Sequence, residues 1–201
     1  PTRTIPVTTT PIATTFLLPI QVLSSSPGLG RAYDVAISPD DAHVYVAGSG
    51  DGAIGAFTRD TTTGKLTPLQ VQKDGLNGVD GIAGVRSVAV SPDGKHLYAA
   101  GAGDDAVAAF ARDTVSGTLT FVEREKDGVN GVDGLDLPAS VVVSPGGAHV
   151  YVAGAFDDAV ALFTRNAQTG ALTFVARVKD GVGGVEGIEG ARSLALSPDG
   201  R

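Results

Sequence analysis

The sequence predicts an all-β fold made of repeated four-stranded sheets, and three observations support this prediction. A Ser-Pro turn motif returns every 53 residues, at Ser38, Ser91, Ser144 and Ser197, without insertion or deletion. Short apolar segments alternate with turns rich in Gly, Asp and Thr, and no segment has the 3.6-residue period of a helix. The 201 residues include 28 Gly but only 5% aromatic residues. Small side chains and valine must therefore fill the core.

Each repeat contains four strand-like segments in a constant order. In the first repeat they cover residues 34–37, 43–48, 53–59 and 66–72, and the later copies follow at the same 53-residue interval. Pro and Gly between the first two segments supply the backbone angles of a tight turn. We therefore expect three complete sheets, at about residues 33–72, 86–125 and 139–178.

Four antiparallel strands repeated at a fixed interval are typical of the blades of a β-propeller. One blade cannot bury both of its faces alone, so neighbouring blades must stack. A fourth copy of the first segment, SLAL (193–196), predicts a partial blade at the C-terminal end of a propeller segment over residues 16–201.

Two N-terminal stretches differ from the repeats. Residues 1–15 are rich in Thr and Pro and predict a linker or stalk. The stretch TFLLPIQVL (15–23) predicts a further outer strand of a partial blade. The alternative is a strand donated to a neighbouring chain, which would build a filament or an intermolecular ring.

Composition excludes several classes of function. The chain has 15 Lys and Arg against 22 Asp and Glu, a formal charge of −7, which argues against a nucleic-acid or anionic-membrane surface. It contains no Cys, so disulfides and thiolate chemistry are absent. No apolar run reaches 18 residues, so we expect no membrane insertion.

Most polar residues recur once per repeat, which favours structural roles over catalysis. His43, His96 and His149 occupy equivalent positions, whereas a catalytic histidine is needed once, in one pocket. The same reasoning applies to further equivalent sets: Arg59, Arg112 and Arg165; Asp51, Asp104 and Asp157; and the pair Arg86 and Arg192, with Tyr33 and Ala139 at the corresponding positions. No phosphate loop, zinc-protease motif or nucleophile elbow occurs. We therefore assign no catalytic residue.

The connectors between repeats are the candidate metal sites. In KDGLNGVDG (73–81) and its two copies, acids lie six residues apart among glycines, a mixture of hard oxygen ligands and bendable backbone that suits Ca²⁺. The alternative is a glycine-built turn in which the first Asp pairs with the preceding Lys or caps backbone N–H groups. The candidate ligands are Asp74, Asp80, Asp127, Asp133, Asp180 and Glu186; we expect no other cofactor.

The stretches SPDGKHLYAAG (91–101), DDAVAAFARD (104–113) and VRSVAVSPDG (85–94) resemble bacterial lactonase-like propellers, the group that includes YVTN-type surface repeats. The resemblance extends over residues 31–201. It implies a closed ring, usually of seven blades, so we expect this chain to be a fragment of a longer ring. It also implies either lactone hydrolysis or an adhesive role.

Three functional hypotheses follow. Because the repeats lack singular polar residues, the first is a structural or binding scaffold without an active site, secreted, on the cell surface or periplasmic, with a protein or carbohydrate partner. The second is a lactonase-like hydrolase of sugar lactones. The third is a self-assembling subunit of a filament or ring, whose N-terminal strand pairs with an open sheet edge of a neighbouring chain.

Overall fold

A computed structural model describes residues 28–200. Within this range, twelve strands form three antiparallel sheets of four, which confirms the all-β blade architecture. The first blade holds β1 (Ala32–Ile37), β2 (His43–Gly48), β3 (Ala53–Arg59) and β4 (Leu66–Lys73). The second holds β5 (Val85–Val90), β6 (His96–Gly101), β7 (Ala106–Arg112) and β8 (Leu119–Lys126). The third holds β9 (Pro138–Val143), β10 (His149–Gly154), β11 (Ala159–Arg165) and β12 (Leu172–Lys179).

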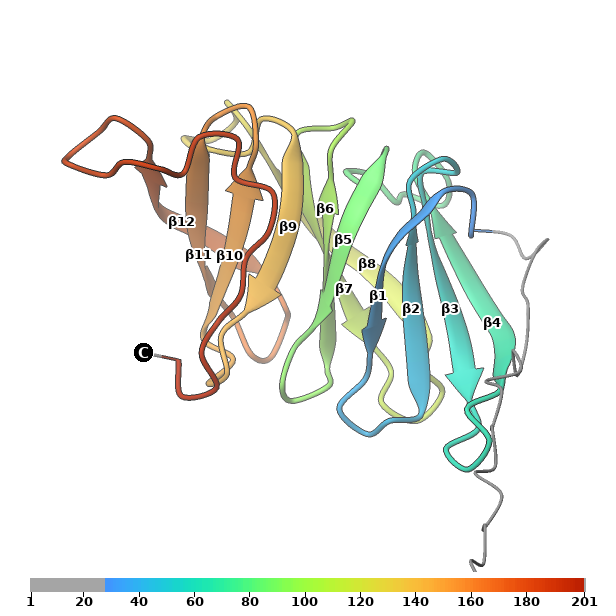
Figure 1. Cartoon of the computed structure of the whole chain (residues 1–201). Helices are drawn as coiled ribbons and strands as arrows, with labels where there is room; N and C mark the ends of the chain where they lie inside the picture. The colour runs from blue at the N-terminus through green and yellow to red at the C-terminus, as the bar shows by residue number, and fades with distance from the viewer. Residues whose placement is uncertain (1–27, 201) are drawn as a thin grey trace, which may run out of the picture.

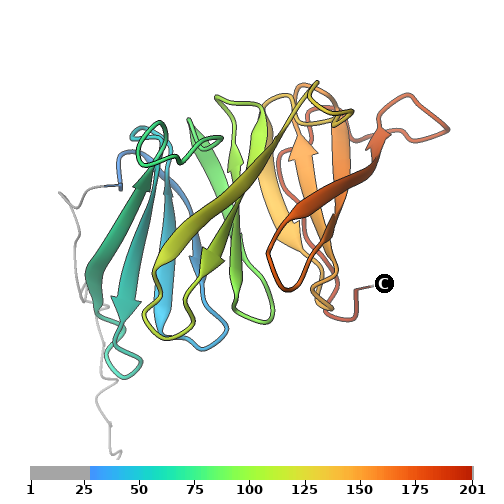
Figure 2. The ribbon, with the colours of Figure 1, turned by 180° about the vertical axis from the view of Figure 1, so that it is seen from behind.

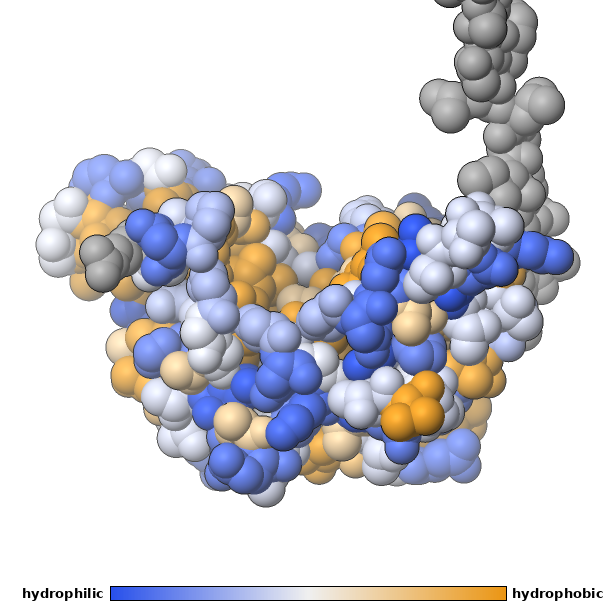
Figure 3. All heavy atoms as spheres, turned by 90° about the horizontal axis from the view of Figure 1, so that it is seen from below, coloured by the Kyte–Doolittle hydropathy of each residue, from blue (hydrophilic) through white to orange (hydrophobic). Residues whose placement is uncertain are grey.

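The strands of each blade follow one another in sequence order across the sheet. The blades stand side by side (Figures 1 and 2), and their first strands are in contact, β1 with β5 and β5 with β9. Seen from below, the molecule is an arc that is hollowed on one side (Figure 3). The first strand of every blade is therefore the inner strand, and the fourth is the outer one.

Two apolar clusters fill the spaces between blades. Between the first and second blades, Tyr45 and Ile54 pack with Leu97 and Phe110. The second cluster repeats this arrangement one blade further on. Alanines occupy many remaining positions, because closely stacked sheets leave little depth for side chains. This explains why a chain with few aromatic residues still buries a core.

A glycine ends the second strand of every blade because the connector passes directly over it. A Cβ atom on Gly101 would lie 2.2 Å from the carbonyl oxygen of Gly81, in the preceding connector. Gly48 and Gly154 meet the same obstacle, at 2.1 and 2.3 Å. The glycine that ends the Tyr-Val-Ala-Gly and Tyr-Ala-Ala-Gly motifs is therefore required by a close contact between two backbone segments.

The structure corrects one expected element. Residues 193–196 do not form a strand, because no other described segment pairs with them; Leu194 N–H donates instead to the Oγ of Ser140. The linker expected over residues 1–15 and the outer strand expected over 15–23 lie outside the described residues. Over residues 28–200, no helix is long and apolar enough to cross a membrane.

Candidate functional site

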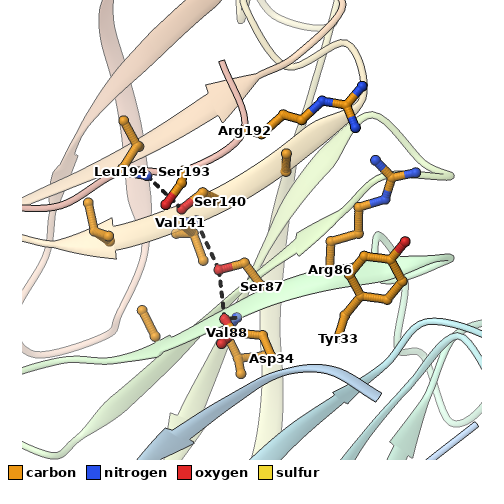
Figure 4. Close-up of a pocket in the computed structure, with 13 residues that line it drawn as sticks. Tyr33, Asp34, Arg86, Ser87, Val88, Ser140, Val141, Arg192, Ser193 and Leu194 are labelled. Carbon is orange, nitrogen blue, oxygen red and sulfur yellow. Dashed lines mark hydrogen bonds between the residues drawn. The ribbon is translucent and has the colours of Figure 1, made fainter. Parts of the chain in front are cut away.

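A cavity of about 580 Å³ lies along the inner strands (Figure 4). Its walls come from the start of β1, from β5 and β9, and from the segment after the third connector. The polar side chains that line it are Tyr33, Asp34, Arg86, Ser87, Ser140, Arg192 and Ser193. Equivalent positions of successive repeats therefore meet in one place.

Two arginines give this cavity its charge. Figure 4 shows the guanidinium groups of Arg86 and Arg192 extending to the same side, while Ala139 takes the equivalent position on the intervening blade. The guanidinium carbon of Arg86 lies 5.8 Å from the centre of the Tyr33 ring, within the range of a cation–π contact. Among residues 28–200, neither arginine forms an ion pair. Such unpaired guanidinium groups are suited to binding an anion.

The next position along the inner strands joins the blades. The Oδ2 atom of Asp34 accepts hydrogen bonds from Ser87 Oγ, at 2.9 Å, and from Val88 N, at 3.0 Å. Ser87 Oγ in turn accepts from Val141 N at 3.2 Å. Asp34 is the acid among three serines at this position, and among residues 28–200 it is the one carboxylate that lines the cavity.

Repeat equivalence hides this site from sequence reasoning. Arg86 and Arg192 match each other, which favours a structural role for both. The sequence signal that could have found the site is a difference between repeats at equivalent positions. One such position holds Tyr33, Arg86, Ala139 and Arg192, and the next holds Asp34 in the first repeat and serine in the others. A composite site uses such differences.

The three histidines lie away from the cavity. Tyr33 and Asp34 lie near the start of β1, whereas Ile37, at its end, pairs with Val44. His43 therefore lies at the other end of β1 from Tyr33 and Asp34. His43 and His96 are buried at blade interfaces, where each ring contacts an arginine of the next blade. No histidine lines the described cavity, so a Ser-His-Asp arrangement is absent from it.

The predicted metal ligands fall on one rim, in two complete groups. Asp74 and Asp80 meet Asp104 of the next blade, and the candidate ligand atoms lie within 4.8 Å of one another. Asp127, Asp133 and Asp157 form the second group. Asp180 and Glu186 belong to no such group among the described residues. Sequence reasoning missed Asp104 and Asp157, because each belongs to a different blade.

These acids also have structural partners. Asp74 Oδ1 accepts from Ile82 N at 3.1 Å, as the glycine-turn alternative predicts, and Asp104 Oδ2 accepts from Ala83 N at 2.8 Å. Arg124 Nε lies 2.6 Å from Asp80 Oδ2. Burial raises the pKa of Asp74, and the carboxylates of Asp104 and Asp80 add to the rise. The group therefore concentrates negative charge, and calcium binding stays a prediction.

Comparison with known proteins places these features in a family. Residues 34–185 match the family model described as lactonase, 7-bladed beta-propeller. The 6-phosphogluconolactonase of Bacillus subtilis is 26% identical over 152 residues, which is 76% of this chain and 42% of the relative. A protein of Arthroderma benhamiae named "Probable 6-phosphogluconolactonase" is 29% identical over 54% of this chain and 28% of its own length. The chain thus spans less than half the length of these curated relatives.

A solved protein structure is also similar to this chain. The periplasmic gluconolactonase of Pseudomonas aeruginosa is 29% identical and superposes with a TM-score of 0.64, covering 77% of this chain and 41% of its own.

The names of these relatives correct the leading functional hypothesis. A scaffold without an active site is the wrong interpretation, because the matched proteins are named as lactonases; the lactonase-like alternative fits them better. The error arose from treating repetition as evidence against a site. The twelve strands, their grouping into blades and the matched family model lead to one conclusion: the chain, whose described residues form three consecutive blades, belongs to the seven-bladed β-propeller lactonase family.

Proposed function

We propose that this chain forms part of the active-site wall of a hydrolase acting on sugar lactones. The observation that supports this most directly is that Arg86 and Arg192 both line the inner-strand cavity. Neither arginine has an ion-pair partner among the described residues. In an acidic protein of charge −7, such a local concentration of positive charge favours an anionic ligand or a developing oxyanion.

The proposed reaction is the addition of water to the lactone carbonyl carbon. The ring C–O bond then breaks, and the released alkoxide takes up a proton to give the open-chain hydroxy acid. Arg86 and Arg192 would stabilise the negative charge that develops on the carbonyl oxygen, or hold an anionic group of the sugar. Asp34 would accept the proton of the attacking water, since a carboxylate retains acceptor capacity beyond the bonds from Ser87 and Val88.

The relatives support a sugar acid lactone as the substrate class. Two of them are named for 6-phosphogluconolactone and one for gluconolactone, so the phosphorylated and the neutral lactone should both be assayed.

The periplasmic description of the Pseudomonas aeruginosa protein supports a location outside the cytoplasm. Fractionation of the source cells would test that location, and recovery in the cytoplasmic fraction would contradict it.

The substitutions Arg86→Ala and Arg192→Ala test the proposed site. Loss of a hydrogen bond to a charged group costs about 1.5–3 kcal/mol. Each change should therefore lower kcat/KM for lactone hydrolysis about 10- to 100-fold, while the melting temperature is unchanged. Hydrolysis should be followed by acid release at constant pH, with subtraction of the spontaneous rate.

The matched control is Arg124→Ala on outer strand β8, whose guanidinium pairs at the surface with Asp80. This variant should retain wild-type activity. Equal loss in all three variants, or no loss in the two cavity variants, would show that the proposed site is wrong.

A further inference from the structure

Each interface between blades contains the same buried cluster around an arginine. At the first interface, the Arg112 side chain is 0% exposed. It donates from Nε to Tyr45 Oη at 2.7 Å, and from Nη1 to the Gly94 carbonyl at 2.8 Å. Its Nη2 atom lies 2.8 Å from both Asp40 Oδ2 and His43 Nδ1. One side chain from the second blade thus holds three side chains of the first.

The second interface repeats this cluster. The Arg165 side chain is 2% exposed and donates to Tyr98 Oη at 3.0 Å and to Asp93 Oδ2 at 2.8 Å. Its Nη2 atom lies 2.6 Å from His96 Nδ1. Because the two clusters are independent copies, the arrangement is a property of the fold.

The cluster fixes the protonation state of both histidines. A guanidinium group has only donors, so Nδ1 of His43 and His96 must be an unprotonated acceptor. A proton at that atom would remove the hydrogen bond and bring two positive charges to within about 3 Å of each other.

The rings also have no room to turn away. A Cβ atom on Gly117 would lie 2.0 Å from Cδ2 of His43, and one on Gly170 would lie 2.2 Å from Cδ2 of His96. The exposed fractions of the two histidines are 4% and 3%. Relief of an added charge therefore requires movement of one blade against the next.

The neighbouring charges act in both directions. Burial lowers the pKa of His43 and His96, and the adjacent arginine lowers it further. Asp40 and Asp113 oppose the decrease at His43, as Asp93 does at His96, whereas Lys95 adds to the decrease at His96. Tyr45 and Tyr98 complete the surroundings as buried hydroxyl groups. Burial and arginine outweigh the carboxylates at both rings.

We propose that His43 and His96 make the blade interfaces proton-sensitive: a proton taken up at Nδ1 displaces the arginine and loosens the contact between adjacent blades. The same interfaces carry two hydrogen bonds along the cavity wall: Ser87 Oγ donates to Asp34, and Val141 N–H donates to Ser87 Oγ. Loosening therefore also disturbs the inner strands.

His149 is the matched control that the chain itself supplies. It occupies the equivalent position on β10, but it is only half-buried. The preceding turn has Gly146 where the other two blades have Asp40 and Asp93. No arginine among residues 28–200 contacts the His149 ring, which lies 6.4 Å from the Tyr151 ring.

The experiment compares the wild-type chain, the double variant His43→Asn/His96→Asn and the control His149→Asn by thermal unfolding between pH 7 and pH 5. Asn places a neutral acceptor oxygen close to the position of Nδ1. The lowered pKa means that the unfolded chain takes up protons first as the pH falls, so the wild type loses stability below about pH 6.5. Asp74, Asp136 and Glu125 act in the opposite direction, because their pKa values are raised, but they are common to all three proteins.

We expect Tm to fall by several degrees more in the wild type and in His149→Asn than in the double variant. An equal fall in all three proteins would overturn the proposal. If the double variant does not fold, imidazole ¹⁵N titration of the wild type decides. Titration of His43 and His96 well below pH 6.5 supports the proposal, and titration at or above that value overturns it.

Discussion

At the scale of single residues, glycine and tyrosine make the close contacts between blades possible. Tyr45 Oη donates to the Gly117 carbonyl at 2.8 Å, and Tyr98 Oη does the same to Gly170. Burial raises the pKa of Tyr98 to about 12, so its hydroxyl keeps its proton and continues to donate at any physiological pH. The absent side chain of each glycine leaves the space that the histidine ring occupies.

The substitution Gly117→Ala should therefore destabilise the protein more than a turn glycine normally would. The φ angle of Gly117 is 77°, and that of Gly75 is 73°, so both alanine variants have the same backbone cost of about 1–2 kcal/mol. A Cβ atom on Gly75 would have nothing within 4 Å beyond its chain neighbours, whereas one on Gly117 would meet His43. Overpacking should add about 1–3 kcal/mol for Gly117→Ala. Urea unfolding measures the difference, and equal costs in the two variants would contradict the contact.

At the scale of elements, the strands could be predicted to within two residues, but the contacts of the connectors with the next blade could not. Strand bounds follow from local alternation and turn chemistry, which every repeat restates. The acid groups instead depend on contacts between blades: Asp104 follows β6 yet meets Asp74 and Asp80 of the preceding connector. Segment 193–196 shows that a strand-like pattern is not sufficient, because no described strand pairs with it. Local pattern predicts an element, and packing decides its surroundings.

If Ca²⁺ occupies the acid groups, about 10 mM Ca²⁺ should raise the melting temperature relative to EDTA. Sites with Kd values of 10⁻⁴–10⁻³ M would gain roughly 1.4–2.7 kcal/mol each at this concentration. The raised pKa of Asp74 adds a pH dependence, because protons compete with the cation as the pH falls toward that pKa. Differential scanning calorimetry measures the shift.

The control for this experiment is the double variant Asp80→Asn/Asp133→Asn, which removes one carboxylate from each group. It should lose most of the response to Ca²⁺. A wild-type melting temperature that does not change between EDTA and Ca²⁺, or a variant that responds equally, would leave only the glycine-built turn.

At the scale of the whole molecule, blades are joined by a repeated interface, and the candidate site exists only because they are joined. Tyr33, Arg86 and Arg192 come from three different repeats. The propeller architecture could be predicted from the 53-residue period and the four strand-like segments in each repeat, because every copy restates them. The site could not, since its residues are unequal copies whose proximity depends on stacking. Any change that separates the blades should therefore affect stability and site together.

The substitution Arg165→Met tests this dependence. It leaves Asp93 and His96 without their buried partner. Breaking a buried ion pair costs about 3–5 kcal/mol, and the lower end of that range applies here because the Asp93 side chain is 33% exposed. Arg59→Met is the matched control, because Arg59 ends β3 as Arg165 ends β11, but its described ion pair is with Asp41 on its own blade, with both side chains partly exposed. Such a pair contributes less than about 1 kcal/mol. Urea unfolding should thus separate the free energies of unfolding of the two variants by at least about 2 kcal/mol.

Hydrogen exchange should show faster opening at β9 in Arg165→Met, where Val141 N–H donates to Ser87. Unchanged exchange at Val141 would mean that the cavity wall is held independently of the arginine clusters.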